Sequence, residues 1–357
     1  MNRETVFYQE ALVDVKPLND ILRRGAENFK KLSVLVAAVD AGIFDALHTP
    51  QSASDLADSL GIDSAIASDT CLILKTLGLL EDENGLYKNT AVSSVYLRSD
   101  SPLQQKNVLQ NLQNSCKLWG NLPEILKNGP VETCADAFFM DNLIHSLAEE
   151  ALCGELQRTV NIIASQPEFA AAGKLLDLGG GHGLYAIAFT RLNPNLQAYV
   201  YDLPNVVEDT KQYIAKHGAE RVEVIAGNFF QDELGGEYDI IFFASNPGGK
   251  NPGLIPKIYA GLKSGGILIN KHCFYHGAED SKNPLLDMEW KLTALAGVNK
   301  GRRVYSFQDD LYWDQYLRLL ERYFTIRKVI DAPEFKGHQL CKIGDTLDAK
   351  IIVAKKR

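Results

Sequence analysis

The chain has 357 residues, 46% hydrophobic and 23% charged, a composition typical of a globular protein with a sizeable core. At this length two domains are expected, because single cores stop growing at about 250–300 residues. The net charge of −8 argues against a nucleic-acid partner. The sequence contains no run of about 18 apolar residues that would predict a membrane-spanning helix, so we expect no membrane partner. Six scattered cysteines without a C-x-x-C pair argue against a metal site and fit a cytoplasmic protein with free thiols.

Residues 1–100 predict helices followed by one small hairpin. Apolar residues recur at helical spacing in "LSVLVAAVDAGIFDAL", and "SASDLADSLGI" and "DSAIASDTCLILKTLGLL" predict two further helices. An Asn-Gly turn between two apolar runs in "LLEDENGLYKNT" indicates a hairpin. This is the order of a winged helix. Because the third helix offers one lysine and no arginine, we interpret the domain as a packing or dimerisation module, with DNA binding as the alternative.

The rest of the chain predicts a helical connector over residues 101–172 and an α/β domain over residues 173–357. In the latter, the strands "KLLDLG", "LQAYVYD", "VEVIAG", "YDIIFFA" and "GGILINKHC" alternate with helices, and "FTIRKVID" and "AKIIVAKK" follow. This pattern indicates a Rossmann-like, doubly wound, mainly parallel seven-stranded sheet. The last two strands are joined by about 20 residues without a helical pattern, so we expect the last strand to be antiparallel.

The segment "LLDLGGGHG" places glycines at the end of the first strand of this sheet. Glycines let a ligand approach the backbone closely, and the helix that follows directs free N–H groups into the same space. Asp202 ends the second strand, where a carboxylate accepts hydrogen bonds from ribose hydroxyls. These features predict an adenosine-bearing ligand. The stretch "GHGLYA" by itself also matches the dinucleotide pattern G-x-G-x-x-A.

The acid before the glycines makes "LLDLGGGHG" resemble the first motif of class I S-adenosylmethionine methyltransferases. The segments "LVAAVDAGIFDAL", "YDLPNVVEDT" and "AGNFFQDELGGEYDIIFF" further resemble the small-molecule O-methyltransferases of the plant caffeate and bacterial antibiotic-tailoring type. This resemblance implies S-adenosylmethionine as the cofactor and a small, aromatic or cyclic methyl acceptor. It also implies a homodimer formed through the winged-helix domain, and a connector that contributes to the acceptor pocket.

The resemblance also implies the residues that hold the cofactor. Asp177 and the loop glycines are expected at its methionine end, Asp202 at the ribose, and Asn228 with Phe229 at the adenine. Asn228 replaces the aspartate usual in the family, and it keeps an acceptor oxygen for the adenine amino group. The implied cofactor-binding residues are Asp177, Gly179, Gly181, Gly183, Asp202, Leu203, Asn228 and Phe229. No metal ligands are predicted.

The sequence departs from this family after the fourth strand. The family continues into a segment resembling V-L-H-D-W, whose histidine deprotonates the acceptor, whereas this chain continues "SNPGGKNPGL". We predict that His272, in "NKHC" at the end of the fifth strand, assists the acceptor as a replacement base and that Asn246 positions it. Two alternatives remain open. His272 is a structural histidine at a strand end, or the acceptor arrives already nucleophilic and no side chain acts as a base.

Several other residues also carry predictions. We expect Lys250 to be a solvated loop lysine, His145 to be structural, and His182 to lie beside the cofactor. The resemblance implies acceptor-pocket candidates at Trp119, Phe138, Phe139, Met140, Asp287, Met288 and Trp290, and the spacing of these residues equally suits helix cores. The predicted activity is methyl transfer to a small metabolite. The alternative function is a relative that binds S-adenosylmethionine without transferring its methyl group, in a structural or sensory role.

Overall fold

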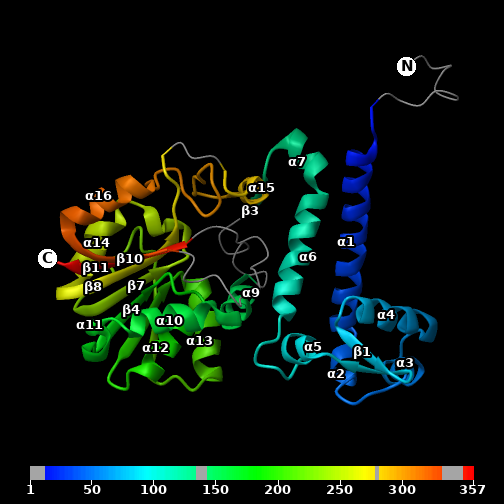
Figure 1. The fold of residues 1–357 in the computed structure, drawn as a ribbon. Coiled ribbons are helices and arrows are strands. Elements are labelled where there is room, and N and C mark those ends of the chain that lie inside the picture. The colour runs from blue at the N-terminus through cyan, green and yellow to red at the C-terminus, as the bar shows by residue number, and fades with distance from the viewer. Residues whose placement is uncertain (1–12, 134–142, 278–280, 332–348) are drawn as a thin grey trace. The chain divides into compact units, whose positions relative to one another are not determined.

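The computed structural model describes residues 13–133, 143–277, 281–331 and 349–357. The chain forms two compact units, residues 1–106 and residues 107–357, so most of the predicted connector is grouped with the α/β domain (Figure 1). None of the helices in the described part of the chain has the length and apolar character needed to cross a membrane.

The N-terminal unit contains helices and one antiparallel hairpin, in the predicted order. Its elements are α1 (Lys16–Asp40), α2 (Ile43–Ala46), α3 (Ala53–Leu60), α4 (Ser64–Thr76), β1 (Leu80–Glu83), β2 (Leu86–Asn89) and α5 (Ala91–Tyr96). The side chains of Ser52 and Asp63 accept backbone hydrogen bonds that cap α3 and α4. Asn84 and Gly85 both have positive φ, as a two-residue hairpin turn of this hand requires.

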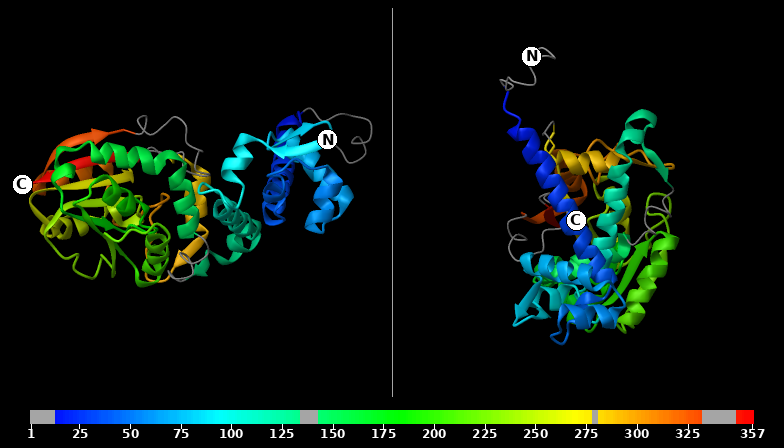
Figure 2. Two further views of the ribbon diagram at one scale, coloured as in Figure 1. Left: turned by 90° about the horizontal axis from the view of Figure 1, so that it is seen from below. Right: turned by 90° about the vertical axis from the view of Figure 1, so that its right-hand side faces the viewer.

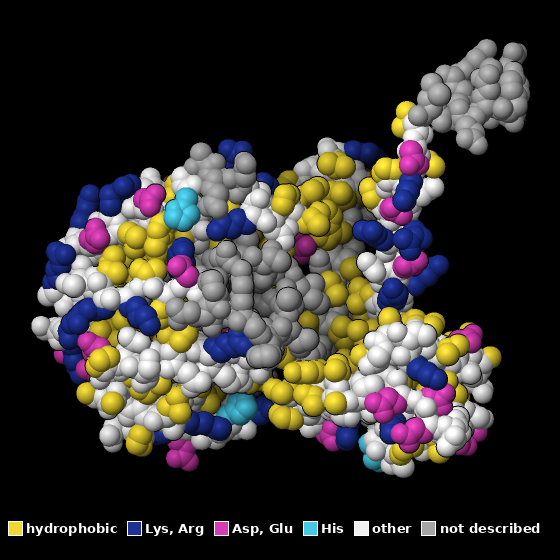
Figure 3. All heavy atoms as spheres, in the orientation of Figure 1, with side chains coloured by type: hydrophobic (Ala, Val, Ile, Leu, Met, Phe, Trp, Pro, Cys, Tyr) yellow, Lys and Arg dark blue, Asp and Glu magenta, His cyan; other side chains and the backbone are white. Residues whose placement is uncertain are grey.

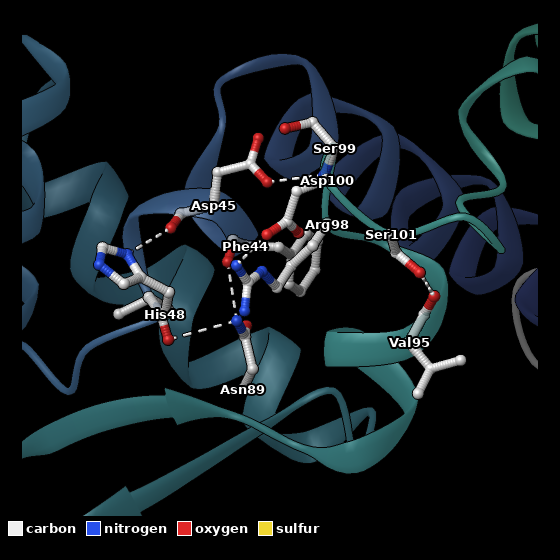
Figure 4. A network of polar contacts seen from close by, with 10 residues as sticks. Phe44, Asp45, His48, Asn89, Val95, Arg98, Ser99, Asp100 and Ser101 are labelled. Atoms are coloured by element: carbon white, nitrogen blue, oxygen red, sulfur yellow. Dashed lines mark hydrogen bonds and ion pairs between the residues drawn. The ribbon is translucent and has the colours of Figure 1, made fainter. Parts of the chain in front are cut away.

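Polar contacts join the short helix α2 to the hairpin and to the segment after α5 (Figure 4). The Asn89 side-chain amide donates to the carbonyl oxygens of Phe44 at 2.7 Å and Leu47 at 3.2 Å. The Ser99 N–H donates to Asp45 Oδ1 at 2.7 Å. The two bonds from Asn89 pair carbonyl groups at the end of α2, which has too few residues to satisfy them internally.

The second unit is built around a seven-stranded sheet of order β10-β11-β8-β7-β4-β5-β6. In this sheet β11 runs opposite to the other six strands, which are parallel to one another. This confirms the predicted mainly parallel sheet. The strands are β4 (Lys174–Leu178), β5 (Gln197–Asp202), β6 (Val222–Ala226), β7 (Tyr238–Ala244), β8 (Leu262–Cys273), β10 (Phe324–Ile330) and β11 (Ala349–Lys356). The main helices are α6 (Lys106–Gly120), α7 (Leu122–Asn128), α9 (Leu143–Glu150), α10 (Leu156–Ala164), α11 (Pro167–Ala171), α12 (Leu184–Leu192), α13 (Pro204–Lys216), α14 (Leu254–Gly261), α15 (Pro284–Lys291) and α16 (Trp313–Tyr323).

Helices cover both faces of this sheet, as Figures 1 and 2 show. Successive side chains of a strand point to opposite faces, so Leu175 enters the core beneath α10 and α12, whereas Leu176 enters the core beneath α14 and α16. Both leucines are fully buried. This arrangement leaves the carboxyl ends of the parallel strands as the edge at which a ligand site is expected.

Two features of the connector region differ from the predicted run of α-helices. Residues Val131–Thr133 form a strand, β3, that pairs in parallel with β9 (Thr293–Leu295), because Gly129 and Pro130 end the preceding helix. Between α9 and α10 the chain has a kink, η2 (Ala151–Glu155), where Cys153 and Gly154 depart from helical geometry and Gly154 has a φ of 118°. The loop expected between the last two strands spans residues 332–348, outside the described residues.

Candidate active site

The glycine loop between β4 and α12 has the backbone conformation that its glycines permit. Gly179, Gly181 and Gly183 have φ values of 65°, 52° and 71°, a region that other residues enter only with strain. The Gly179 N–H donates to the Tyr201 carbonyl oxygen at 2.7 Å, which fixes the start of the loop against β5. The loop is therefore a formed element at the carboxyl end of the sheet.

Close packing also requires glycine in this loop. A Cβ at Gly180 would lie 2.7 Å from Asp177 Cγ, and a Cβ at Gly183 would lie 2.8 Å from Thr210 Cγ2. The Thr210 hydroxyl donates to the Gly181 carbonyl oxygen at 2.5 Å. Thr210 belongs to α13 and was not among the predicted site residues, because nothing in "VVEDTKQY" distinguishes it from any other helical threonine.

Two buried carboxyl groups lie beside the loop. Asp177 is 1% exposed, and its Oδ2 has no hydrogen-bond partner among the described residues. Burial, together with the charge of Asp202, raises the pKa of Asp177 to about 7, although a hydrogen bond from the Ala186 N–H opposes the shift. Burial likewise raises the pKa of Asp202 to about 6, against the hydrogen bonds that it accepts at 2.8 Å from the N–H groups of Gly181 and Leu203. Such a pair fits a ligand that brings a positive charge and hydrogen-bond donors.

The predicted adenine side of the site is the turn after β6. Asn228 Oδ1 accepts a hydrogen bond from the Phe230 N–H at 3.0 Å, and the Asn228 N–H donates to Asp232 Oδ2 at 2.7 Å. The Asn228 oxygen thus makes one bond within the turn and retains a second lone pair. Phe229 is buried and its ring contacts that of Phe230 with 4.7 Å between centroids. The adenine role of both residues stays a prediction.

Asn246 lies against the glycine loop, although it follows a different strand. A Cβ at Gly179 would lie 2.5 Å from Asn246 Nδ2, and Asn246 Oδ1 accepts a hydrogen bond from the Gly248 N–H at 3.0 Å. The carboxyl ends of β4 and β7 are adjacent in the sheet, which brings the two segments together. The structure therefore brings Asn246 and the predicted methionine end of the site to one place.

His272 lies near the end of β8, but its ring is 3% exposed. A Cβ at Gly249 would lie 1.8 Å from His272 Nε2, so this nitrogen faces the backbone of the loop after β7. It has no hydrogen-bond partner in the described part of the chain. Burial and the charges of Lys250 and Lys271 hold the pKa of His272 well below its usual value. Its role as a base stays a prediction, and this environment weighs against it.

Lys250 is not the solvated lysine that we expected. It is 5% exposed, and its ammonium group donates to the carbonyl oxygens of Tyr305 at 2.9 Å and Cys273 at 3.3 Å. Burial lowers its pKa, which the charge of Asp310 partly offsets. This burial could not be predicted from local patterns, because the two carbonyl groups come from segments 23 and 55 residues away.

The predicted acceptor-pocket residues lie in several places. The Trp119 indole N–H donates at 2.7 Å to Glu289, a residue of α15, which joins α6 to that helix. Asp287 is buried and forms an ion pair with Arg303 at 3.1 Å. Trp290 is also buried. The remaining candidates of the connector, Phe138, Phe139 and Met140, lie outside the described residues.

Comparisons with known proteins agree with this geometry. The family model of the O-methyltransferase dimerisation domain matches residues 24–99, and that of the O-methyltransferase domain matches residues 140–302. An uncharacterized protein from Methanocaldococcus jannaschii is 39% identical over 346 residues, which cover 90% of this chain and 92% of that protein. The chain belongs to the S-adenosylmethionine-dependent O-methyltransferase family.

A further relative and a solved structure extend this result. The acetylserotonin O-methyltransferase of Macaca mulatta is 28% identical to this methyltransferase over 299 residues, which cover 77% of this chain and 85% of that protein. An O-methyltransferase family protein from Burkholderia thailandensis shares the fold with a TM-score of 0.72 and 19% identity, over 97% of this chain and 99% of that one. The methyltransferase activity on small molecules and the cofactor S-adenosylmethionine, both predicted above, are confirmed.

Proposed function

We propose that this O-methyltransferase acts on a small aromatic or cyclic metabolite whose oxygen reaches the site already nucleophilic, without a base from the loop after β7. The observation that carries the proposal is the packing of that loop. A Cβ at Gly248 would lie 2.7 Å from the Phe230 ring, and a Cβ at Gly249 would lie 1.8 Å from the His272 ring. A side chain long enough to deprotonate the acceptor therefore has no room at either position.

In this proposal the cofactor supplies a methyl group that is already activated for displacement, and the protein binds and orients. Asp177 Oδ2, which is buried and unpartnered among the described residues, accepts from the amino group of the cofactor. Asp202 accepts from the ribose hydroxyls with the lone pairs left free by Gly181 and Leu203. The loop glycines give close access to the backbone. Asn228 and Phe229 flank the adenine.

Asn246 positions the acceptor beside the methionine end, since its amide lies against Gly179. Holding two reacting atoms about 3–3.5 Å apart in line accounts for much of the acceleration in such a transfer. A base is then needed only for an acceptor that is poorly ionised at the working pH.

The competing proposal keeps His272 as the base, because it is the imidazole that lies directly beneath the same loop. The His272→Ala variant separates the two. If His272 is the base, the rate falls about 10²–10⁴-fold while cofactor affinity is kept. If the acceptor arrives ionised, the variant retains its rate and its pH profile.

A panel of hydroxylated aromatic compounds of graded pKa tests the proposal directly. We expect the rate of S-adenosylhomocysteine formation, with a matching increase in acceptor mass, to rise with the ionised fraction of the acceptor. A rate independent of that fraction contradicts the base-free mechanism. If no member of a broad panel or metabolite extract is methylated while the cofactor binds, the non-transferring alternative is favoured.

We also propose that the protein is a homodimer formed through its N-terminal unit. Several apolar side chains of α1, among them Leu18, Ile21, Leu22 and Phe29, are more than half exposed. Their spacing places them along one side of the helix. Figure 3 shows exposed hydrophobic side chains on this unit. Because the dimerisation-domain match includes part of α1, a second copy of the chain is the occupant that fits this stripe.

A further inference from the structure

Helices α9 and α13 both contact the glycine loop, and they also contact each other. From α9, Ile144 Cδ1 would lie 3.6 Å from a Cβ at Gly181, so its side chain covers that glycine. From α13, Thr210 donates a hydrogen bond to the carbonyl oxygen of the same glycine at 2.5 Å. Gly181, in the middle of the glycine loop, is therefore hydrogen-bonded by α13 and covered by α9.

The contact between the two helices is a specific polar one. His145 Nδ1 lies 2.9 Å from the Tyr213 hydroxyl, and the two rings are 5.7 Å apart between centroids. The other ring nitrogen, Nε2, lies 3.8 Å from Asp209 Oδ1. One turn of α13 carries Asp209, Thr210 and Tyr213, so this turn binds both the glycine loop and α9.

The environment of Tyr213 keeps it in the state that this contact needs. Burial, with the nearby charges of Glu149 and Asp209, raises the pKa of Tyr213 to about 12. A phenol is already protonated near neutral pH at its ordinary pKa of about 10, so Tyr213 is able to donate to His145 Nδ1. In that arrangement Nε2 carries the ring proton and directs it toward Asp209.

We infer that His145 and Tyr213 are positioning residues that hold α9 over the glycine loop and thereby slow the release of the cofactor. In this inference a ligand seated on the loop leaves past α9, and the contact between His145 and Tyr213 is one of the bonds that resist movement of α9 away from Gly181. Neither residue has a part in the proposed methyl transfer. The dissociation rate of the cofactor therefore reports this role, and it can be measured without knowing the acceptor.

The experiment measures the dissociation rate of S-adenosylhomocysteine from the full-length protein by stopped-flow displacement. The variants are Tyr213→Phe, which removes only the hydroxyl, His145→Leu, and the double variant. We expect each single change to raise the dissociation rate about 3–10-fold, as loss of one hydrogen bond allows. The double variant should dissociate no faster than the faster single variant, because both changes remove the same contact. His145→Asn, which keeps a polar atom near the Nδ1 position, should restore a rate close to that of the wild type.

Tyr259→Phe is the matched control. Tyr259 lies on α14, and its hydroxyl donates to the Arg357 carbonyl oxygen at 3.4 Å, so it loses a similar bond away from the loop. Unchanged dissociation rates in Tyr213→Phe and His145→Leu, or additive effects in the double variant, would overturn the inference. A wild-type protein that does not bind S-adenosylhomocysteine would instead contradict the cofactor assignment, which keeps the two failures distinguishable.

Discussion

At the scale of single residues, the proposed contacts of Asp177 and Asp202 with the cofactor lead us to predict that cofactor binding depends on pH. Without the cofactor, burial holds their pKa values at about 7 and about 6, above the ordinary value of 3.8. The folded protein therefore binds protons that the unfolded chain has lost. Its free energy of unfolding falls as the pH rises from about 4 to about 7.

In the proposed site the amino group of the cofactor favours the ionised form of Asp177, so we expect cofactor binding to reverse this preference. We predict that S-adenosylhomocysteine binds about tenfold more tightly at pH 8 than at pH 6, since a shift of one pKa unit corresponds to a factor of ten. Titration calorimetry in two buffers of different ionisation enthalpy should show protons released at the lower pH. The Asp177→Asn variant should bind more weakly and release fewer protons. Equal affinity across this range, without proton release, would contradict the assignment of both carboxyl groups.

At the scale of elements, the kink between α9 and α10 depends on Gly154. Its φ of 118° is strained for any residue with a side chain. We predict that Gly154→Ala lowers the free energy of unfolding by about 1–3 kcal/mol, measured by urea denaturation. Gly120→Ala is the control, because Gly120 lies in α6 and a Cβ there would meet nothing within 4 Å. A loss of stability in Gly120→Ala as large as that in Gly154→Ala would disprove the backbone explanation.

Some features of these elements could be predicted from the sequence, and others could not. The strands and the glycine loop were predictable, because apolar periodicity and the positions of glycine are local signals. The burial of His272 was not, because it depends on Gly249, which is 23 positions earlier in the chain and packs over the ring. The same holds for Lys250, whose carbonyl partners come from distant segments. Likewise, the pairing of β3 with β9 joins segments about 160 residues apart, which local patterns do not reveal.

At the scale of the whole molecule, the apolar stripe on α1 makes assembly testable. We predict a mass about twice the chain mass of 39.5 kDa by light scattering at micromolar concentration. Leu22→Glu places a charge in the stripe and should shift the protein toward the monomer. Lys31→Glu, on the opposite side of α1, is the control and should leave the dimer intact. A wild-type monomer, or equal effects of both changes, would contradict an interface along this helix.

The contact between Gly249 and His272 also has an evolutionary consequence. A Cβ at position 249 would lie 1.8 Å from His272 Nε2, so a side chain at 249 and an imidazole at 272 exclude each other. The two positions should therefore covary among relatives, with glycine at 249 wherever 272 is histidine and a smaller residue at 272 wherever 249 bears a side chain. The order of change is constrained as well. A lineage that gains a side chain at 249 has to lose the histidine first, so that change begins at a position outside the loop.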